Sequence, residues 1–231
     1  MGIDTQLKPD QIEPCVQATV SNANLKRNAL YLYAGSCYAP GGYAWVFPKA
    51  NNCANIGLGI NGKYASKEKH SIDYLNEFLD KYFPEASIQR LVSGGVPVTR
   101  NVDPLALENM LIAGDAGHMV NPLNGGGITH AIDSGIQAGQ HAVEACNNPE
   151  KIDKIFDRYK KYIQKRFGKN HESLDRIKDV VYQLNDDEFN ELGEEILKMN
   201  IEKRSFLGVF SKAIKKNPSL LVDVARAFTG I

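Results

Sequence analysis

"LIAGDAGHMVNPLNGGGITHAIDSGIQAGQHAVEA", residues 111–145, is the stretch that decides the expected fold. It passes from an apolar segment through Asp115 and Pro122 to the glycines at 125–127, and continues with small and aliphatic residues at helical spacing. Glycine disfavours a helix interior by about 1 kcal/mol relative to alanine, so a helix that begins on glycines implies a need for bare backbone. We predict a strand over 109–115, a tight turn, and a helix that ends near residue 146.

This arrangement is typical of a ligand site. Asp115 would lie at the carboxyl end of a strand, where α/β folds place ligands, and its carboxylate can accept hydrogen bonds from sugar hydroxyls. Pro122 stiffens the turn. Gly125, Gly126 and Gly127 present backbone N–H groups at the positive end of the helix dipole, which favours a phosphate, a carboxylate or an electron-rich carbonyl. The alternative is an ordinary tight turn whose small residues serve packing alone.

The residues before this stretch are typical of β-structure, because β-branched and aromatic residues cluster or alternate between turn residues. We predict strands over 15–22, 29–36, 43–48, 53–60 and 88–98. Residues 66–83 carry apolar side chains at helical spacing, and Pro84 ends the helix that they predict.

Beyond Pro149 the chain is charged and amphipathic, which predicts helices. We expect them over 150–166, 170–184, 187–200 and 203–230. The predicted fold class is α/β (α+β) with a mixed β-sheet. The predicted segments are a β-rich domain at 1–100, a strand-turn-helix at 101–147 and a helical region at 148–231.

The composition narrows the function classes. Lys and Arg together number 27, as do Asp and Glu, so nothing suggests nucleic acid as a partner. The four cysteines are scattered, which fits a reducing cytoplasm, and no apolar run is long enough to span a membrane. The five histidines lack a carboxylate or cysteine set that would complete a metal site, and we predict none.

The sequence "GLGING", residues 57–62, has the spacing of a dinucleotide-binding fingerprint. Such a site needs a helix that opens inside the motif, whereas the polar and bulky "KYASKEKHS" follows here. We therefore interpret these residues as a strand and a turn.

The segment "GDAGHMVNPLNGGGITHAIDSG", residues 114–135, resembles the second flavin-binding motif of the hydroxybenzoate-hydroxylase-type flavoproteins. The resemblance implies that fold and FAD as the cofactor. It implies that Asp115 binds the ribityl and pyrophosphate region, that Gly127 and Ile128 give N–H groups to the isoalloxazine, and that Pro122 lines the ring pocket. Gly125 and Gly126 complete the implied cofactor-binding set.

A second segment, "APGGYAWVFPKANNCANIGLGI" at 39–60, is similar to the substrate-domain signature of the geranylgeranyl reductases. Tyr43, Trp45 and Phe47 alternate, so they share one strand face. Beside a flavin they would suit an isoprenoid lipid substrate, although core packing alone also explains them. The resemblance implies a reductase that saturates C=C bonds in geranylgeranyl chains of archaeal ether-lipid precursors. Tyr43 and Cys37 are the candidate proton donors, and neither is decisive.

Members of this family begin with a strand–GxGxxG–helix unit for the ADP part of FAD, whereas residues 1–13 read "MGIDTQLKPDQIE". We therefore expect a C-terminal portion that binds FAD weakly alone and needs an N-terminal FAD-binding segment or chain. Two alternatives stay open: a quinone-linked electron-transfer relative, against which the lack of cysteines after Cys146 counts, and a non-catalytic lipid-binding remnant. The basic segment 159–169 suggests peripheral membrane contact.

Overall fold

The computed structural model describes residues 4–66, 68–182, 184–200 and 224, so the helix predicted at 203–230 lies outside the described residues except for Val224. The chain divides into two compact units. Unit 1 comprises Met1–Leu7, Pro97–Val181 and Lys198–Ile231, and unit 2 comprises Lys8–Val96 and Tyr182–Leu197. The division of the chain into three functional segments stays a prediction.

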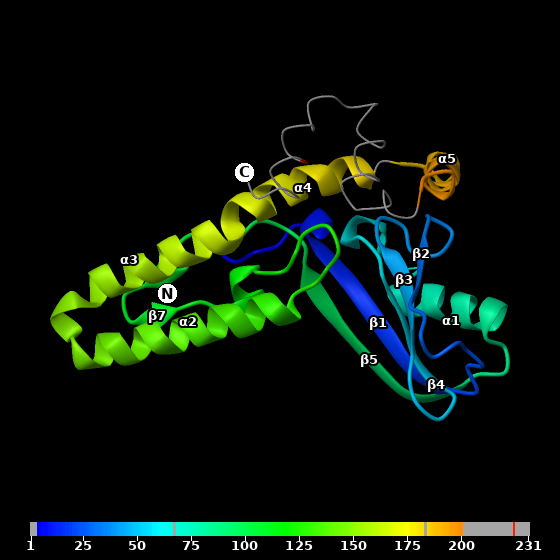
Figure 1. The fold of residues 1–231 in the computed structure, drawn as a ribbon, viewed down its shortest axis with the longest axis horizontal. Helices are drawn as coiled ribbons and strands as arrows, with labels where there is room; N and C mark the ends of the chain where they lie inside the picture. The colour runs from blue at the N-terminus through cyan, green and yellow to red at the C-terminus, as the bar shows by residue number, and fades with distance from the viewer. Residues whose placement is uncertain (1–3, 67, 183, 201–223, 225–231) are drawn as a thin grey trace. The chain divides into compact units, whose positions relative to one another are not determined.

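Unit 2 is built on a five-stranded sheet in the order β2-β3-β4-β1-β5 (Figure 1). The strands are β1 (Ile12–Ser21), β2 (Tyr31–Ala34), β3 (Tyr43–Pro48), β4 (Cys53–Gly59) and β5 (Ser87–Pro97). The pairs β1–β4, β2–β3 and β3–β4 are antiparallel. Helices α1 (Ser71–Tyr82) and α5 (Asp186–Leu197) complete the unit, with short 3-10 turns at Pro9–Gln11 and Gly62–Tyr64. All five predicted strands and the helix before Pro84 are confirmed.

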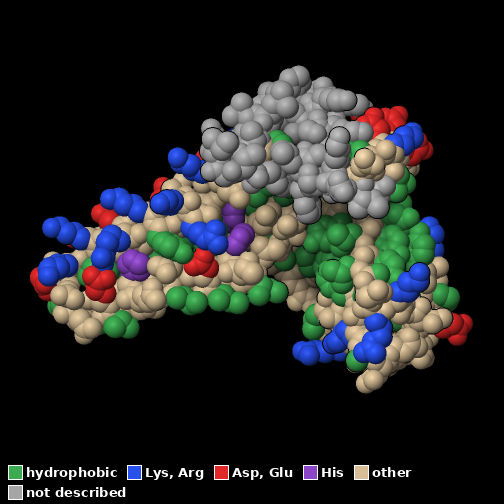
Figure 2. Space-filling view, viewed as in Figure 1, with side chains coloured by type: hydrophobic (Ala, Val, Ile, Leu, Met, Phe, Trp, Pro, Cys, Tyr) green, Lys and Arg blue, Asp and Glu red, His purple; other side chains and the backbone are tan. Residues whose placement is uncertain are grey.

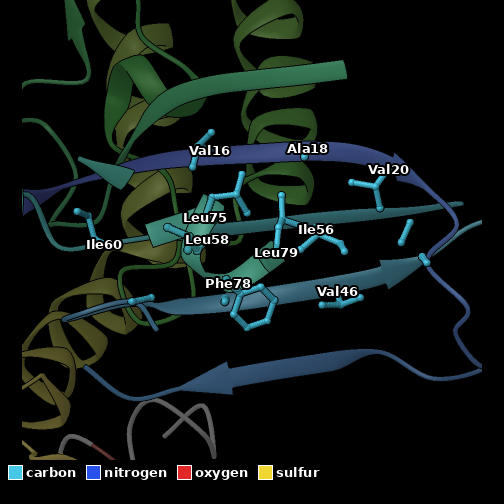
Figure 3. Close-up of a cluster of buried hydrophobic side chains, with 14 residues drawn as sticks. Val16, Ala18, Val20, Val46, Ile56, Leu58, Ile60, Leu75, Phe78 and Leu79 are labelled. Atoms are coloured by element: carbon cyan, nitrogen blue, oxygen red, sulfur yellow. The ribbon is translucent and has the colours of Figure 1, made fainter. Parts of the chain in front are cut away.

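Alternation along the strands gives the sheet one apolar face, which α1 covers (Figure 3). Its buried residues include Val16, Ile56 and Leu58 from the strands and Leu75 and Phe78 from the helix. Residues 57–62 run from the end of β4 into the 3-10 turn at Gly62–Tyr64, which confirms that "GLGING" is a strand and a turn.

Unit 1 is mostly helical. A two-stranded antiparallel sheet of β6 (Ala106–Leu107) and β7 (Met110–Leu111) leads into a 3-10 turn at Gly114–Gly117. Helix α2 (Ile128–Asn147), a 3-10 turn (Pro149–Lys151), α3 (Ile152–Ile163), a π-helical segment (Gln164–Gly168) and α4 (Lys169–Val181) follow. Helices α2 and α3 pack against each other, and the buried Tyr159 and Ile163 of α3 form a core with Met119.

Two sequence expectations need correction. The strand predicted at 109–115 is confined to β7, because a strand extends only as far as its hydrogen-bonding partner and β6 is two residues long. Asp115 consequently lies in a 3-10 turn rather than at a strand end. The break expected between 166 and 170 is also absent, because Gly168 lies in the π-helical segment that joins α3 directly to α4.

No helix in the described ranges combines the length and the apolar character that crossing a bilayer requires.

Candidate functional site

The 3-10 turn that carries Asp115 lies directly against α2. Gly114 has a positive φ of 61°, and a Cβ at this position would lie 3.3 Å from Cβ of Ala131. His118 ends the turn in the left-handed region, with its N–H donating to the Asp115 carbonyl. Glycine at 114 therefore allows both the backbone conformation and the close approach to the helix.

Two side chains of α2 hold this turn in place. The buried Ser134 hydroxyl accepts a hydrogen bond from the Gly114 N–H at 3.0 Å and donates to the His130 carbonyl at 2.7 Å. His130 Nδ1 lies 3.0 Å from the Met119 carbonyl, to which it donates. Because the turn is bonded to α2 at both ends, its position relative to the first turn of the helix is fixed. Sequence reasoning assigned neither residue this role.

The structure brings together Asp115 and Gly127, two of the residues predicted to bind the cofactor. The Asp115 side chain is exposed, and a Cβ at Gly127 would lie 3.3 Å from Asp115 Oδ1 and 3.1 Å from Val120 Cγ2. The carboxylate therefore stands beside the N-terminus of α2, and any residue larger than glycine at 127 would press on it.

The three glycines serve different purposes. Gly125 has a φ of 68°, and its N–H donates to the Asn121 carbonyl at 3.0 Å. The Gly126 N–H donates to Asn124 Oδ1 at 2.9 Å. Within the part of the chain that the structure describes, the N–H groups of Gly127 and Ile128 have no acceptor. Gly125 and Gly126 therefore shape the turn, and the next two residues offer the available donors.

The rest of the turn is rigid. Asn121 Oδ1 accepts from the N–H groups of Leu123 and Asn124, at 3.0 Å and 3.3 Å, and Pro122 is buried. An asparagine side-chain oxygen that accepts a hydrogen bond from the backbone N–H two residues later is a common feature of turns. The available donors at the helix start are consequently held in place before any ligand binds.

The site combines two available N–H donors at a positive helix end with an exposed carboxylate. A phosphate would be attracted by the helix end and repelled by the carboxylate. A ligand that presents an uncharged, electron-rich carbonyl to the donors and hydroxyl groups to the carboxylate satisfies both. A flavin with its ribityl chain has this pattern, so the residues present fit the cofactor that the resemblance implies.

The aromatic residues predicted to contact substrate form a continuous row on β3, on the sheet face opposite α1. Ring centroids lie 5.7 Å apart for Tyr43 and Trp45 and 6.4 Å apart for Trp45 and Phe47. Trp45 Nε1 donates to Gln17 Oε1 at 3.0 Å. A Cβ at Gly57, which pairs with Trp45 across the strands, would lie 2.6 Å from the indole Cζ2. Gly57 therefore gives the indole room to lie on β4.

A buried carboxyl group that sequence reasoning missed lies near one end of this row. Glu13 is 4% exposed and accepts a hydrogen bond from the Tyr182 hydroxyl. Burial and the charge of Glu13 raise the pKa of the Cys15 thiol to about 12. Burial raises the pKa of Tyr43, and Glu13 and Cys15 add to this increase. At neutral pH Cys15 and Tyr43 therefore hold their protons.

The other candidate proton donor, Cys37, lies elsewhere in unit 2. It is exposed and precedes Tyr38, whose ring packs against the α1 core and whose hydroxyl lies 2.8 Å from that of Tyr82. Cys37 is thus a neighbour of the α1 side of the sheet, whereas Tyr43 belongs to the aromatic row. The structure does not bring the two candidates together.

Comparison with known proteins shows what the chain is similar to. Residues 11–97, which contain strands β1 to β5 and helix α1, match the model of the geranylgeranyl reductase catalytic domain. A digeranylgeranylglycerophospholipid reductase from Methanococcoides burtonii is 36% identical over 228 residues, which are 99% of this chain and 56% of that protein. The chain therefore spans about half the length of the curated relatives that it matches.

Solved structures agree on the fold. A geranylgeranyl bacteriochlorophyll reductase-like protein from Thermoplasma acidophilum superposes with a TM-score of 0.87 and 26% identity, covering 98% of this chain and 58% of that one. A flavin-dependent brominase has a TM-score of 0.60 at 14% identity, over 93% of this chain and 57% of its own, and shows the fold alone. The predicted α/β flavoprotein fold is confirmed.

Proposed function

We propose that the chain, which is similar to the geranylgeranyl reductases, is the substrate-binding and flavin-facing part of an FAD-dependent reductase of that family. Its reaction is the saturation of C=C bonds in geranylgeranyl chains of archaeal ether-lipid precursors. The observation that carries the proposal is the placement of the exposed Asp115 carboxylate beside the available N–H groups of Gly127 and Ile128. The family match favours this reaction over quinone-linked electron transfer.

Unit 1 provides the cofactor contacts. Asp115 accepts from the ribityl hydroxyls, the N–H groups of Gly127 and Ile128 donate to the electron-rich edge of the ring, and the buried Pro122 borders the ring pocket. Bound reduced flavin supplies the hydride that such a reduction needs. Because Ser134 and His130 fix the turn on α2, these groups are positioned before the cofactor arrives.

Unit 2 provides the substrate contacts. The row of Tyr43, Trp45 and Phe47 offers an apolar surface to an isoprenoid chain. Trp45 is held by Gln17, which fixes the indole without adding charge to this surface. The Tyr43 hydroxyl is the proposed source of the proton, because it stands within the row and is protonated at neutral pH. The burial that raises its pKa also makes it a weaker acid, so the proposal rests on its position.

Peripheral membrane contact is also a proposal. It rests on the segment 159–169, where Lys161, Lys165 and Lys169 are exposed. Cationic side chains near anionic head groups stabilise surface binding by about 1 kcal/mol each. Sedimentation with vesicles that contain anionic archaeal-type lipid tests it, and binding that is insensitive to salt would contradict it.

The main test combines the chain with a separately produced polypeptide: the portion of the Methanococcoides burtonii relative that lies outside the match. We expect the mixture to bind FAD, seen by flavin absorbance after gel filtration, and to saturate geranylgeranyl lipid, seen by mass spectrometry, when reduced by dithionite. Asp115→Ala should weaken FAD binding at least tenfold, because a hydrogen bond to a charged group contributes about 1.5–3 kcal/mol. Asp80→Ala, at an exposed position of α1, is the control. Unchanged FAD affinity in Asp115→Ala would contradict the cofactor assignment.

A further inference from the structure

The end of the aromatic row that carries Tyr43 is built around Gly59. This residue pairs with Cys15 of β1 on one side and with Tyr43 of β3 on the other. Side chains of directly paired residues lie on the same face of a sheet. A Cβ at Gly59 would lie 2.8 Å from Cys15 Sγ and 3.3 Å from Glu13 Oε2. Glycine at 59 therefore leaves room for the Cys15 thiol and the Glu13 carboxyl on the face that carries Tyr43, with no side chain of β4 at this position.

The Glu13 carboxyl is held from outside the sheet. It is buried and accepts a hydrogen bond from the hydroxyl of Tyr182, a partly exposed residue that follows α4. Burial and the charge of Glu13 raise the pKa of Tyr182. Tyr43 and Cys15 contribute to this increase. Hydrophobic side chains gather over the strands of unit 2 (Figure 2), so charges in this cluster are weakly screened, and the ionisation of one group affects the others.

The proposed reaction leaves Tyr43 in need of a proton. Saturation of a C=C bond adds a hydride to one carbon and a proton to the other. If the Tyr43 hydroxyl gives that proton, its O–H bond breaks and a phenolate remains. Burial disfavours this anion, and so does the charge of Glu13. A route that brings a proton back to the Tyr43 oxygen is therefore required before the next reduction.

We propose that Glu13 and Tyr182 are positioning residues that act through Tyr43 and return a proton to it after each reduction. The inference rests on the proposed function, in which Tyr43 supplies the proton. Glu13 in its acid form gives its proton to the Tyr43 oxygen across the bare backbone of Gly59. The O–H bond of Tyr182 then breaks in favour of the Glu13 carboxylate, as Tyr182 takes a proton from water. One proton enters from water for each proton that reaches the alkene, and no electrons move in this relay.

The test separates the first reduction from later ones. The chain and the unmatched portion of the Methanococcoides burtonii relative are mixed with FAD and geranylgeranyl lipid, and the product is measured by mass spectrometry with one equivalent of dithionite and again with an excess. Glu13→Gln should slow later reductions about tenfold or more relative to the first, for which Tyr43 already holds its proton. Tyr182→Phe should act in the same way. Glu85→Gln, at an exposed position of unit 2, is the matched control and should leave the ratio of the two rates unaltered.

A second measurement needs neither FAD nor the relative. The carbon-13 resonance of the Tyr43 ring, assigned with Tyr43→Phe, is followed by NMR as the chain alone is titrated to high pH. Glu13→Gln should lower the pKa of Tyr43 by about one pH unit, because a carboxylate no longer opposes the phenolate. Circular dichroism over the same pH range checks the fold of each variant.

The outcomes distinguish the relay from the proposed function. An unchanged pKa of Tyr43 in Glu13→Gln, or equal slowing of the first and later reductions, would overturn the inference. Loss of the first reduction in Tyr43→Phe, with an unaltered ratio of rates in Glu13→Gln, would contradict the relay and leave Tyr43 as the proton source. Reduction that continues in Tyr43→Phe would contradict both.

Discussion

The sheet of unit 2 and helix α2 of unit 1 each carry one apolar face, and only the sheet has its face covered within its own unit. Leu75, Phe78 and Leu79 of α1 close over the strands, so that the apolar side chains there are almost wholly buried. The corresponding side chains of α2 stand in solvent. Unit 2 thus buries the apolar face of its sheet, whereas α2 leaves Ile132, Ile136 and Val143 more than half exposed.

The largest expected effect tests the covered face. Leu75 is fully buried, and Leu75→Ala should lower the free energy of unfolding by about 3 kcal/mol, from the lost burial and the cavity left behind. Ile136→Ala, at an exposed position of α2, should change the free energy of unfolding by less than about 0.5 kcal/mol. Urea unfolding followed by circular dichroism measures both. Similar losses in the two variants would show that the α2 face is covered in the chain alone.

The second prediction concerns the pH dependence of stability and a buried histidine of α4. His171 is 1% exposed, and no described residue accepts from or donates to its ring nitrogens. Burial lowers its pKa to about 4, with a contribution from His130. Below about pH 6.5 the imidazole of His171 is protonated in the unfolded chain but stays neutral in the folded chain. The free energy of unfolding therefore falls as the pH falls.

Between pH 8 and pH 5 this loss should be about 2 kcal/mol for His171 alone. Burial also lowers the pKa values of His118 and His130, which act in the same direction. Denaturant unfolding at several pH values measures the slope of the free energy of unfolding against pH, and His171→Leu should reduce this slope. An unchanged slope in that variant would mean that His171 is protonated in the fold.

The third prediction compares glycines within the sheet. Gly57→Ala should destabilise unit 2 by about 1–2 kcal/mol, because its Cβ would meet Trp45 and the backbone of Val16. Trp45 is the only tryptophan, so its fluorescence should change with the same substitution. Gly94→Ala in β5 is the control, since nothing lies within 4 Å of that Cβ. Unaltered fluorescence in Gly57→Ala would place the indole elsewhere.

The smallest expected effect has the opposite sign. Gly135→Ala should raise the free energy of unfolding of the chain alone by about 0.5–1 kcal/mol, because alanine is the better helix former and the site is open. Thermal unfolding by calorimetry measures it. A loss of stability would show that residues of the chain already pack against this part of α2.

Local patterns predicted most of unit 2. Alternation along the segment 43–48 and helical spacing in 66–83 depend on neighbours in sequence, and both elements formed as expected. The length of β7 was not predictable in this way, because it depends on how far its partner β6 extends. The apolar run at 110–113 indicates burial equally well as a strand or as an extended segment.

Local patterns also predicted only part of the candidate site. The glycine turn could be recognised because its residues are consecutive, and the structure places Asp115 beside Gly127. The Tyr182 hydrogen bond to Glu13 joins residues 169 positions apart, and no local pattern predicts such a pair. A carboxylate within the apolar alternation of β1 was the available signal, since buried carboxylates need partners.

That distant pair also bears on how the protein is made. Unit 2 leaves off at Val96 and resumes at Tyr182, so the whole segment 97–181 must be synthesised before the unit is complete. As the ribosome proceeds from the N-terminus, the strands and α1 can assemble early, whereas Tyr182 and α5 join them only after α2, α3 and α4 have emerged. While residues 97–181 are being synthesised, the sheet therefore lacks the Tyr182 hydroxyl that donates to Glu13.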